Sequence, residues 1–190
     1  MNNRMSATKL ILRLASYIMA CALLWGPATA NAAIDAFLKI EGVEGESVVK
    51  GHEGEIDVHA WNWGLSQSGT THMGTGGGAG KVSVQDISFT HFIDIGTPAL
   101  LLACATGKHY KTATLTLRKA GENPLDYLVI TLTDVIVTSV SMGGNRGDNR
   151  NTENVTLNFA KYKYSYQPQD KAGAAKGGAI ETEYDIATNQ

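Results

Sequence analysis

Residues 125–142 read LDYLVITLTDVIVTSVSM, a run of valine, isoleucine, leucine and threonine with neither glycine nor proline. Branched and apolar side chains of this kind pack well on the pleated surface of a sheet, so the run predicts one long β-strand. We expect this strand to bend near Asp134, where a charge interrupts the apolar side chains. The central element of the fold is therefore expected to be β-structure.

The sequence before and after this strand also has the features of β-structure. Short runs with period-two alternation are separated by glycine-rich polar loops, which is the pattern of an all-β domain. In the 56–63 run, Ile56, Val58 and Ala60 are expected on one face. The strands expected on this basis cover residues 37–40, 56–63, 82–93, 112–117, 155–166 and 180–186, the last of them at a sheet edge.

Two of these strands change their alternation part-way. In 82–93 the apolar parity shifts near Asp86, and in 155–166 it passes from odd-numbered residues to three even-numbered tyrosines. A shift of parity indicates a β-bulge or a bend, which barrels use to turn corners. For 155–166, a strand that buries both of its faces is the alternative.

One helix is expected, over residues 97–107. Thr97 supplies a hydroxyl for the N-cap, Pro98 suits the first helical position, and Gly107 is a suitable C-terminal stop. Leu101 is expected on the helix face that packs on the sheet, so that Leu101→Asp would destabilise the fold. Cys104, in the same apolar stretch, is interpreted as an inert packing group.

The first 32 residues differ from the rest. A positive start is followed by an uncharged apolar run from Leu14 to Gly26, then by Pro27 and the small residues Ala30-Asn31-Ala32. This is the pattern of a signal peptide cut after Ala32, and the run is short for a transmembrane helix. The alternative is an N-terminal extension without function. The domain itself is expected to span residues 33–190.

Composition excludes some classes of function. The chain has 190 residues and a formal net charge of -2, which fits one domain and gives no support for sequence-independent nucleic-acid binding. After the leader only Cys104 remains, so the domain forms no internal disulfide. No stable membrane insertion of the mature domain is expected.

No motif in the sequence predicts an enzyme or a cofactor site. The glycine-rich run 74–81 lacks the spacing of a phosphate-binding loop and leads into a strand instead of a helix. A Gly-x-Ser-x-Gly nucleophile motif does not occur, and Cys104 with His109 lacks a neighbouring acid. The histidines are not at zinc-ligand spacing, although two on strands, His59 and His91, could meet. They are His52, His59, His72, His91 and His109.

Trp61 and Trp63 lie on one face of their strand and Asn62 points the other way. The tryptophans are expected in the core. If the opposite face lines a lumen, Asn62 belongs to that lining; otherwise it is an exposed strand residue.

The chain resembles the haemolysin-coregulated protein (Hcp) family over nearly all of residues 33–190. The resemblance rests on many short segments in the right order, so it is more specific than any single motif. These segments are Ala33–Ile40, Gly45–Ser47, Ala60–Gly64, Gln67–Gly69, the glycine-rich run to Val82, Val84–Asp86, Thr97-Pro98, Cys104, Gly107–Tyr110, Leu117–Gly121, Glu153–Phe159 and Tyr166–Pro168.

The resemblance implies a mainly β fold, a compact β-barrel of two sheets with one flanking α-helix. It also implies a homohexamer whose rings stack into a hollow tube, the inner tube of a type VI secretion system. The implied partners are a contractile sheath, spike proteins and small effector proteins in the lumen, and no enzyme activity or cofactor is implied.

Two charged, glycine-containing loops, 42–54 and 143–154, are candidates for contacts between stacked rings, with solvated hairpin ends as the alternative. The candidate stacking residues are Glu44, Glu46, Lys50, Glu53, Arg146, Asp148 and Arg150.

The expected localisation is secreted, with tube assembly in the cytoplasm, although a working leader would route the chain to the periplasm. An exported β-barrel that binds a ligand as a free ring is the alternative function. A secreted hydrolase fits the sequence least well, because no catalytic constellation is visible.

Overall fold

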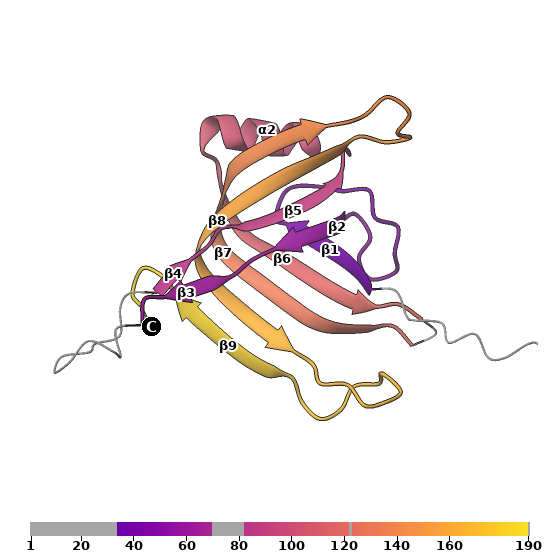
Figure 1. Ribbon diagram of the computed structural model, residues 1–190, viewed down its shortest axis with the longest axis vertical. Coiled ribbons are helices and arrows are strands. Elements are labelled where there is room, and N and C mark those ends of the chain that lie inside the picture. Colours follow the sequence, from indigo (N-terminus) through magenta and orange to yellow (C-terminus); the bar gives the residue numbers. More distant parts are fainter. Residues whose placement is uncertain (1–33, 70–81, 122, 190) are drawn as a thin grey trace, which may run out of the picture. The chain divides into compact units, whose positions relative to one another are not determined.

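The computed structural model describes residues 34–69, 82–121 and 123–189. These residues form nine strands and one helix (Figure 1). In chain order the elements are β1 (Ile34–Ile40), β2 (Ile56–Asn62), β3 (Leu65–Gln67), β4 (Val82–Val84), β5 (Ile87–Phe92), α2 (Thr97–Thr106), β6 (His109–Lys119), β7 (Leu125–Gly143), β8 (Thr152–Tyr166) and β9 (Ile180–Asp185). The expected signal-like leader lies outside the described residues.

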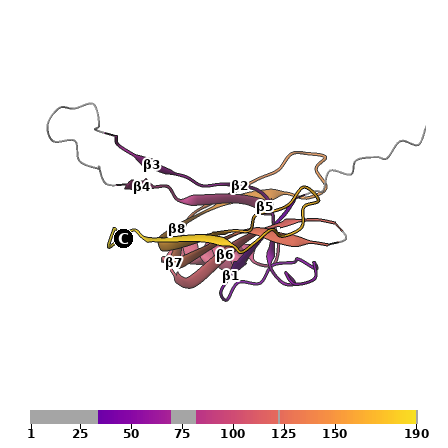
Figure 2. The ribbon, with the colours of Figure 1, turned by 90° about the horizontal axis from the view of Figure 1, so that it is seen from below.

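Six of the strands close into a barrel. The main sheet has the order β5-β2-β1-β6-β7-β8-β9, and a further antiparallel pairing of β5 with β8 joins its ends. Strand β9 is left outside this closure as an edge strand on β8, as the sequence predicts. The short β3–β4 sheet continues β2 and β5 beyond the barrel (Figure 2). The prediction of a mainly β barrel with one flanking helix is confirmed.

The long hairpin of β7 and β8 is where the barrel bends. Asp134 has a positive φ of 54°, and the buried residues of β7 change parity there, from Leu132 to Val135. In β8 the residues that pack on the core change from Phe159 to Tyr162 at the same level. The register with β7 does not shift there, from Thr133–Lys161 to Val135–Phe159; it shifts farther along, between Val137 and Ser139 of β7. The bend expected near Asp134 is confirmed. The bulge considered for 155–166 is not found at the parity change, because the register between β8 and β7 does not shift there.

A true bulge occurs in β2. The register with β5 shifts between Val58 and Ala60, so the core-facing set changes from Ile56 and Val58 to Trp61. Ala60 is exposed as a result. The uninterrupted alternation expected through Ala60 is therefore wrong, because one extra residue reverses every side chain that follows it.

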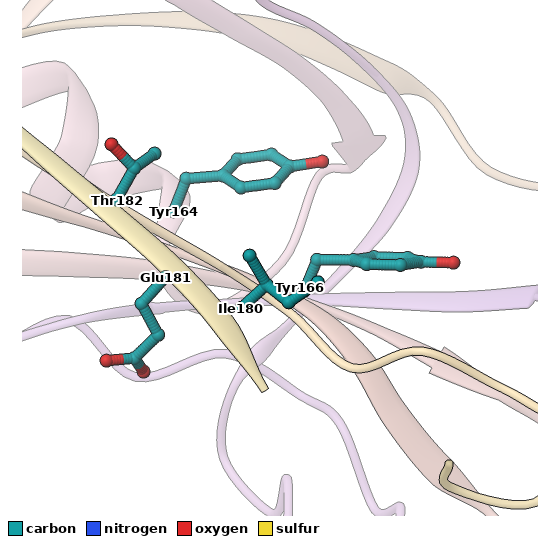
Figure 3. A pocket seen from close by; sticks show the side chains of 5 residues that line it. All are labelled: Tyr164, Tyr166, Ile180, Glu181 and Thr182. Atoms are coloured by element: carbon teal, nitrogen blue, oxygen red, sulfur yellow. The ribbon is translucent and has the colours of Figure 1, made fainter. Parts of the chain in front are cut away.

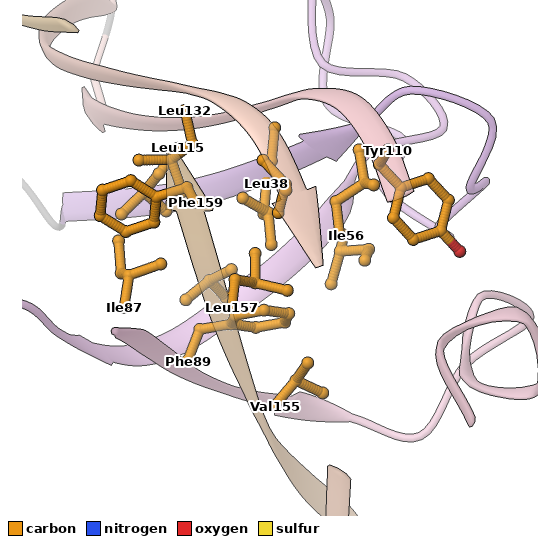
Figure 4. Packing of buried hydrophobic residues seen from close by; sticks show 14 of the residues in the cluster. Leu38, Ile56, Ile87, Phe89, Tyr110, Leu115, Leu132, Val155, Leu157 and Phe159 are labelled. Carbon is orange, nitrogen blue, oxygen red and sulfur yellow. The ribbon is translucent and has the colours of Figure 1, made fainter. Parts of the chain in front are cut away.

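The core fills the barrel with side chains from all six of its strands (Figure 4). Leu38, Phe89, Ile130 and Leu157 are 0–2% exposed and lie on four different strands. Burial of one such side chain contributes about 1.5–3 kcal/mol, so the closed barrel is stabilised mainly by this cluster.

The helix α2 has the expected limits, but two details differ from the sequence-based prediction. Its N-cap is Gly96, and the Thr97 hydroxyl does not cap the helix; it accepts a hydrogen bond from Asp94 N and donates one to Glu153 Oε1. Gly107, with φ of 66°, ends the helix as predicted.

The buried face of α2 also differs from the sequence-based prediction. Leu100 and Ala103 are fully buried, whereas Leu101 is 38% exposed. At 3.6 residues per turn, positions 100 and 103 share a face and position 101 is rotated away from it. The placement of Leu101 against the sheet is therefore wrong.

Candidate functional site

The described histidines do not gather into one site. His91 is 1% exposed and faces the core, whereas His59 is exposed and sets its ring against the edge of Phe92 at 4.2 Å, so the two do not meet. His72 and the glycine-rich run 74–81 lie outside the described residues. Within residues 34–69, 82–121 and 123–189, no group of three or more histidine, cysteine or acidic side chains is arranged to hold a metal ion.

His91 forms a buried polar cluster with residues of β8 and the helix start. Its Nε2 lies 2.8 Å from Glu153 Oε1, and its Nδ1 lies 3.8 Å from Asp94 Oδ2. Burial lowers the pKa of His91, although the nearby carboxylates of Asp94 and Glu153 act in the opposite direction. Because Glu153 also accepts the Thr97 hydroxyl bond, the cluster ties α2 to the barrel.

Cys104 and His109, considered from the sequence as a nucleophile and a base, have different surroundings in the structure. His109 Nδ1 lies 2.7 Å from Asp134 Oδ1, and both of these side chains are more than half exposed. Cys104 is half-buried on α2 and packs against the core. Its packing role agrees with the sequence-based interpretation.

The region around Asn62 is arranged as the sequence predicts. Trp61 and Trp63 pack against the core, and Trp63 Nε1 donates a hydrogen bond to the Gln85 carbonyl at 3.0 Å. The Trp63 ring meets Tyr162 at 4.8 Å between centroids. Asn62 is exposed at the end of β2. Its position in the lining of a lumen stays a prediction.

The structure brings together two of the predicted stacking residues from different loops. Arg150 Nη2 lies 3.4 Å from Glu46 Oε2, and the Arg150 guanidinium lies 4.5 Å from the Phe92 ring centroid. Both charged side chains are about half exposed, so the pair is a weak link between the two loops. All seven predicted stacking residues are exposed: Glu44, Glu46, Lys50, Glu53, Arg146, Asp148 and Arg150.

Two of the other loop carboxylates serve their own loops. Glu53 accepts a hydrogen bond from Gly51 N at 2.8 Å. A hydrogen bond from its own backbone amide, and after it the one from Gly51, lowers the pKa of Glu53. Asp148 accepts a bond from Asn145 N at 3.0 Å within its turn. These contacts stabilise the conformations of the two loops.

An apolar groove at the β8–β9 edge was not predicted from the sequence. Tyr164 and Tyr166 extend their rings side by side from β8, and Ile180 of β9 lies against them, while Glu181 points to the other side (Figure 3). Ile180 is 65% exposed and Tyr166 is 39% exposed. The alternating tyrosines of β8 were the available signal for this surface.

A second feature missed from the sequence is a network around His52. This side chain is 5% exposed although it lies in a polar loop, and its ring stacks on Phe37. Asp126 forms an ion pair with Arg118. Burial raises the pKa of Asp126, but the contacts with Arg118 and His52 outweigh burial and hold this pKa below its usual range. The sequence feature that could have indicated this network is the pair Phe37-Leu38. Two adjacent apolar residues in a strand point to opposite faces, so a second group has to cover the outer one.

Among the described residues, no helix combines the length and the apolar character that are needed to cross a membrane.

Comparisons with known proteins agree with this fold. A family described as "Type VI secretion system effector, Hcp" matches residues 37–166. The protein hcp1 of Pseudomonas aeruginosa is 58% identical over 158 residues, which is 83% of this chain and 98% of that protein.

Solved structures show the same architecture. The crystal structure of Hcp1 from Salmonella typhimurium is 42% identical with a TM-score of 0.70 and covers 83% of this chain and 98% of its own. A type VI secretion system effector from Yersinia pestis is 40% identical with a TM-score of 0.65 and covers 80% of this chain and 99% of its own. The chain therefore belongs to the Hcp family of type VI secretion system proteins.

Proposed function

We propose that this chain is a structural, non-enzymatic subunit of the inner tube of a type VI secretion system. Subunits close into homohexameric rings, and the rings stack into a hollow tube that is expelled from the cell. The observation that carries this proposal is the apolar groove at a free sheet edge, the surface of Tyr164, Tyr166 and Ile180. A single subunit leaves this surface in water.

The free edge itself favours assembly. Among the described residues β9 pairs only with β8, so its other edge has backbone donors and acceptors available to a neighbour. Uncovered edges tend to pair with other chains, and a head-to-tail contact with a closing rotation gives a ring. A neighbouring subunit that packs on β9 would cover both the edge and the exposed Ile180 side chain.

The β3–β4 sheet supports the same conclusion. It is two-stranded, and every residue of β3 is exposed. An isolated two-stranded ribbon is marginally stable in water. A neighbouring subunit in a ring would supply the missing packing surface.

The remaining roles follow from the ring. The loops that carry Glu46 and Arg150 would contact the next ring, and Asn62 would belong to the lumen lining that small effector proteins meet. A contractile sheath and spike proteins are the other expected partners, with assembly in the cytoplasm before secretion.

Size-exclusion chromatography with light scattering, followed by electron microscopy, tests the ring. The expected result is a particle of six subunits that appears as a ring and forms stacks at high concentration. A domain that stays monomeric at high concentration would count decisively against the proposal.

The alternative is an exported binding module that acts as a free ring, which the signal-like residues 1–32 favour. Secretion measured in the native host with and without the sheath separates the two. Secretion that requires the sheath supports the tube, whereas secretion that persists without it supports the free ring. Mass spectrometry of the mature N-terminus shows whether the leader is removed.

A further inference from the structure

The connection between β1 and β2, residues 41–55, folds over the outer face of the barrel, and we call it the flap. Phe37 is 2% exposed although its neighbour Leu38 already faces the core, so Phe37 points outward from the barrel. Its register partner Thr116 on β6 is also buried. The His52 ring covers Phe37, with 4.2 Å between ring centroids and 5° between ring planes.

Polar contacts hold the same histidine from both sides. His52 Nδ1 lies 2.8 Å from Glu55 Oε2, and Nε2 lies 3.4 Å from Asp126 Oδ1 on β7. Arg118 of β6 fixes Asp126 with two bonds, Nε to Oδ1 at 2.5 Å and Nη2 to Oδ2 at 3.2 Å. Its third nitrogen, Nη1, donates to the Lys50 carbonyl of the flap at 2.8 Å. The flap is thus anchored to two barrel strands at once.

The flap also has an ordered backbone of its own. Gly45 N donates to Gly54 O at 2.8 Å, Ser47 N to Glu55 O at 3.0 Å, and Gly54 N to Ser47 O at 2.8 Å. The two arms approach so closely at Gly45 that a Cβ there would lie 2.3 Å from the Glu55 carbonyl oxygen. The flap therefore has one defined conformation in the subunit.

We propose that His52 and Arg118 are positioning residues that fix the flap on the barrel before any partner binds. They act through the backbone at Lys50 and through the stack on Phe37. The side chains that the flap turns outward, among them Glu44 and Glu46, are then presented in one arrangement. A contact surface that is already ordered loses less conformational freedom on binding, which favours assembly. The identity of the partner, a subunit of the next ring, rests on the proposed function.

Hydrogen exchange of the full chain, read by mass spectrometry, tests the positioning directly. The variants are His52→Ala and Arg118→Ala, with Arg118→Lys as the conservative change and Arg150→Ala as the control. We expect amide exchange in residues 46–54 to rise about tenfold or more in the two alanine variants, because the flap opens locally while the barrel stays closed. Arg118→Lys should show a smaller rise, since lysine lacks the planar fork.

The control separates anchoring from a general effect of surface charge. Arg150→Ala removes the exposed contact with Glu46 and should leave flap exchange within about threefold of the wild type. Unchanged flap exchange in both alanine variants would overturn the proposal. So would an equal rise in β6, β7 and β8, because the two residues would then stabilise the whole barrel.

Tube formation supplies the second readout. Electron microscopy of His52→Ala and Arg118→Ala should show intact rings with at least a tenfold loss of stacks. Stacks that match the wild type in length and number, despite an opened flap, would overturn the role in assembly. If the wild-type chain itself forms no rings, the proposed function fails, while the exchange experiment still decides whether the flap is anchored.

Discussion

His91 and Glu153 are ionisable side chains inside a barrel that is filled mainly with apolar residues. Burial lowers the pKa of His91 in the folded protein, whereas an unfolded chain binds the proton at the ordinary value of about 6.5. Below that pH the unfolded state therefore binds more protons than the folded state. The contribution of neutral His91 to stability is fully present above the unfolded pKa and is lost as the pH falls toward the folded pKa.

We expect His91→Gln to reduce this acid sensitivity. Glutamine does not titrate, and its amide is a hydrogen-bond donor of similar reach for Glu153. Urea unfolding at pH 7.5 and pH 5.5 should show a larger loss of unfolding free energy in the wild type than in the variant. Linkage of one proton limits the difference to about 1.4 kcal/mol per pH unit. Equal losses in both proteins would show that His91 does not set the acid sensitivity.

Asp134 has an unusual backbone conformation. Its φ of 54° lies in a region that costs a side-chain-bearing residue about 1–2 kcal/mol, and β-branched residues tolerate it least. Its carboxylate also pairs with the exposed His109. The conformation lets β7 change parity while it stays paired with β8.

Substitutions at Asp134 should therefore separate backbone strain from the ion pair. Asp134→Val should destabilise the fold by about 1–2 kcal/mol, whereas Asp134→Gly should be within about 0.5 kcal/mol of the wild type. His109→Ala, which removes only the pair, is the matched control. The measurement is the denaturation midpoint in urea. If valine and glycine give the same midpoint, strain at this position is not significant.

At the scale of elements, the helix shows why the sequence-based placement of Leu101 against the sheet is wrong. Leu100, Leu101 and Leu102 are consecutive, so the apolar pattern does not select one face. The structure buries Leu100 completely and leaves Leu102 63% exposed. Which leucine is buried depends on how α2 meets the barrel, and that contact is absent from the local sequence.

Alanine substitutions on the helix give the corrected stability prediction. Leu100→Ala should lower the unfolding free energy by about 2–5 kcal/mol, because it leaves a cavity in the core. Leu101→Ala should cost less than about 1 kcal/mol, since that side chain is already 38% exposed. Thermal melting of the two variants side by side checks the placement, and equal losses would contradict it.

The strands were predictable because period-two alternation is a local signal. The first and last residues predicted for β7 and β9 from this alternation lie within one residue of those in the structure. The bulge in β2 was not visible, because Ala60 is small enough to suit either face. The closure of β5 on β8 was not visible either, since it pairs residues such as Phe89 and Val155 that are far apart in sequence.

The candidate surface was predictable only in part. The seven charged loop residues are exposed as expected, yet their charges alone did not show that Glu46 and Arg150 would meet. His52 was considered as a metal ligand and is instead part of the flap anchor. A histidine in a glycine-rich polar loop gives no local sign of the aromatic ring that it covers.

At the scale of the whole molecule, assembly has to act on surfaces that the closed barrel leaves uncovered. Ile180 at the β9 edge and Leu102 on α2 have nearly the same exposure, 65% and 63%. Only Ile180 lies beside a free strand edge and the rings of Tyr164 and Tyr166. The two positions therefore form a matched pair for separating assembly from general surface hydrophobicity.

We expect Ile180→Lys to break the ring and Leu102→Lys to leave it intact. Burial of one isoleucine at a contact contributes about 1.5–3 kcal/mol, and a lysine at a strand edge also opposes edge pairing. The subunit–subunit dissociation constant should thus rise by a factor of about 10 or more. Light scattering over a concentration series measures it, with subunit melting as the check on folding. If both lysine variants stay hexameric, the β9 edge is not the contact, and the ring would have to close through another surface such as the β3–β4 sheet.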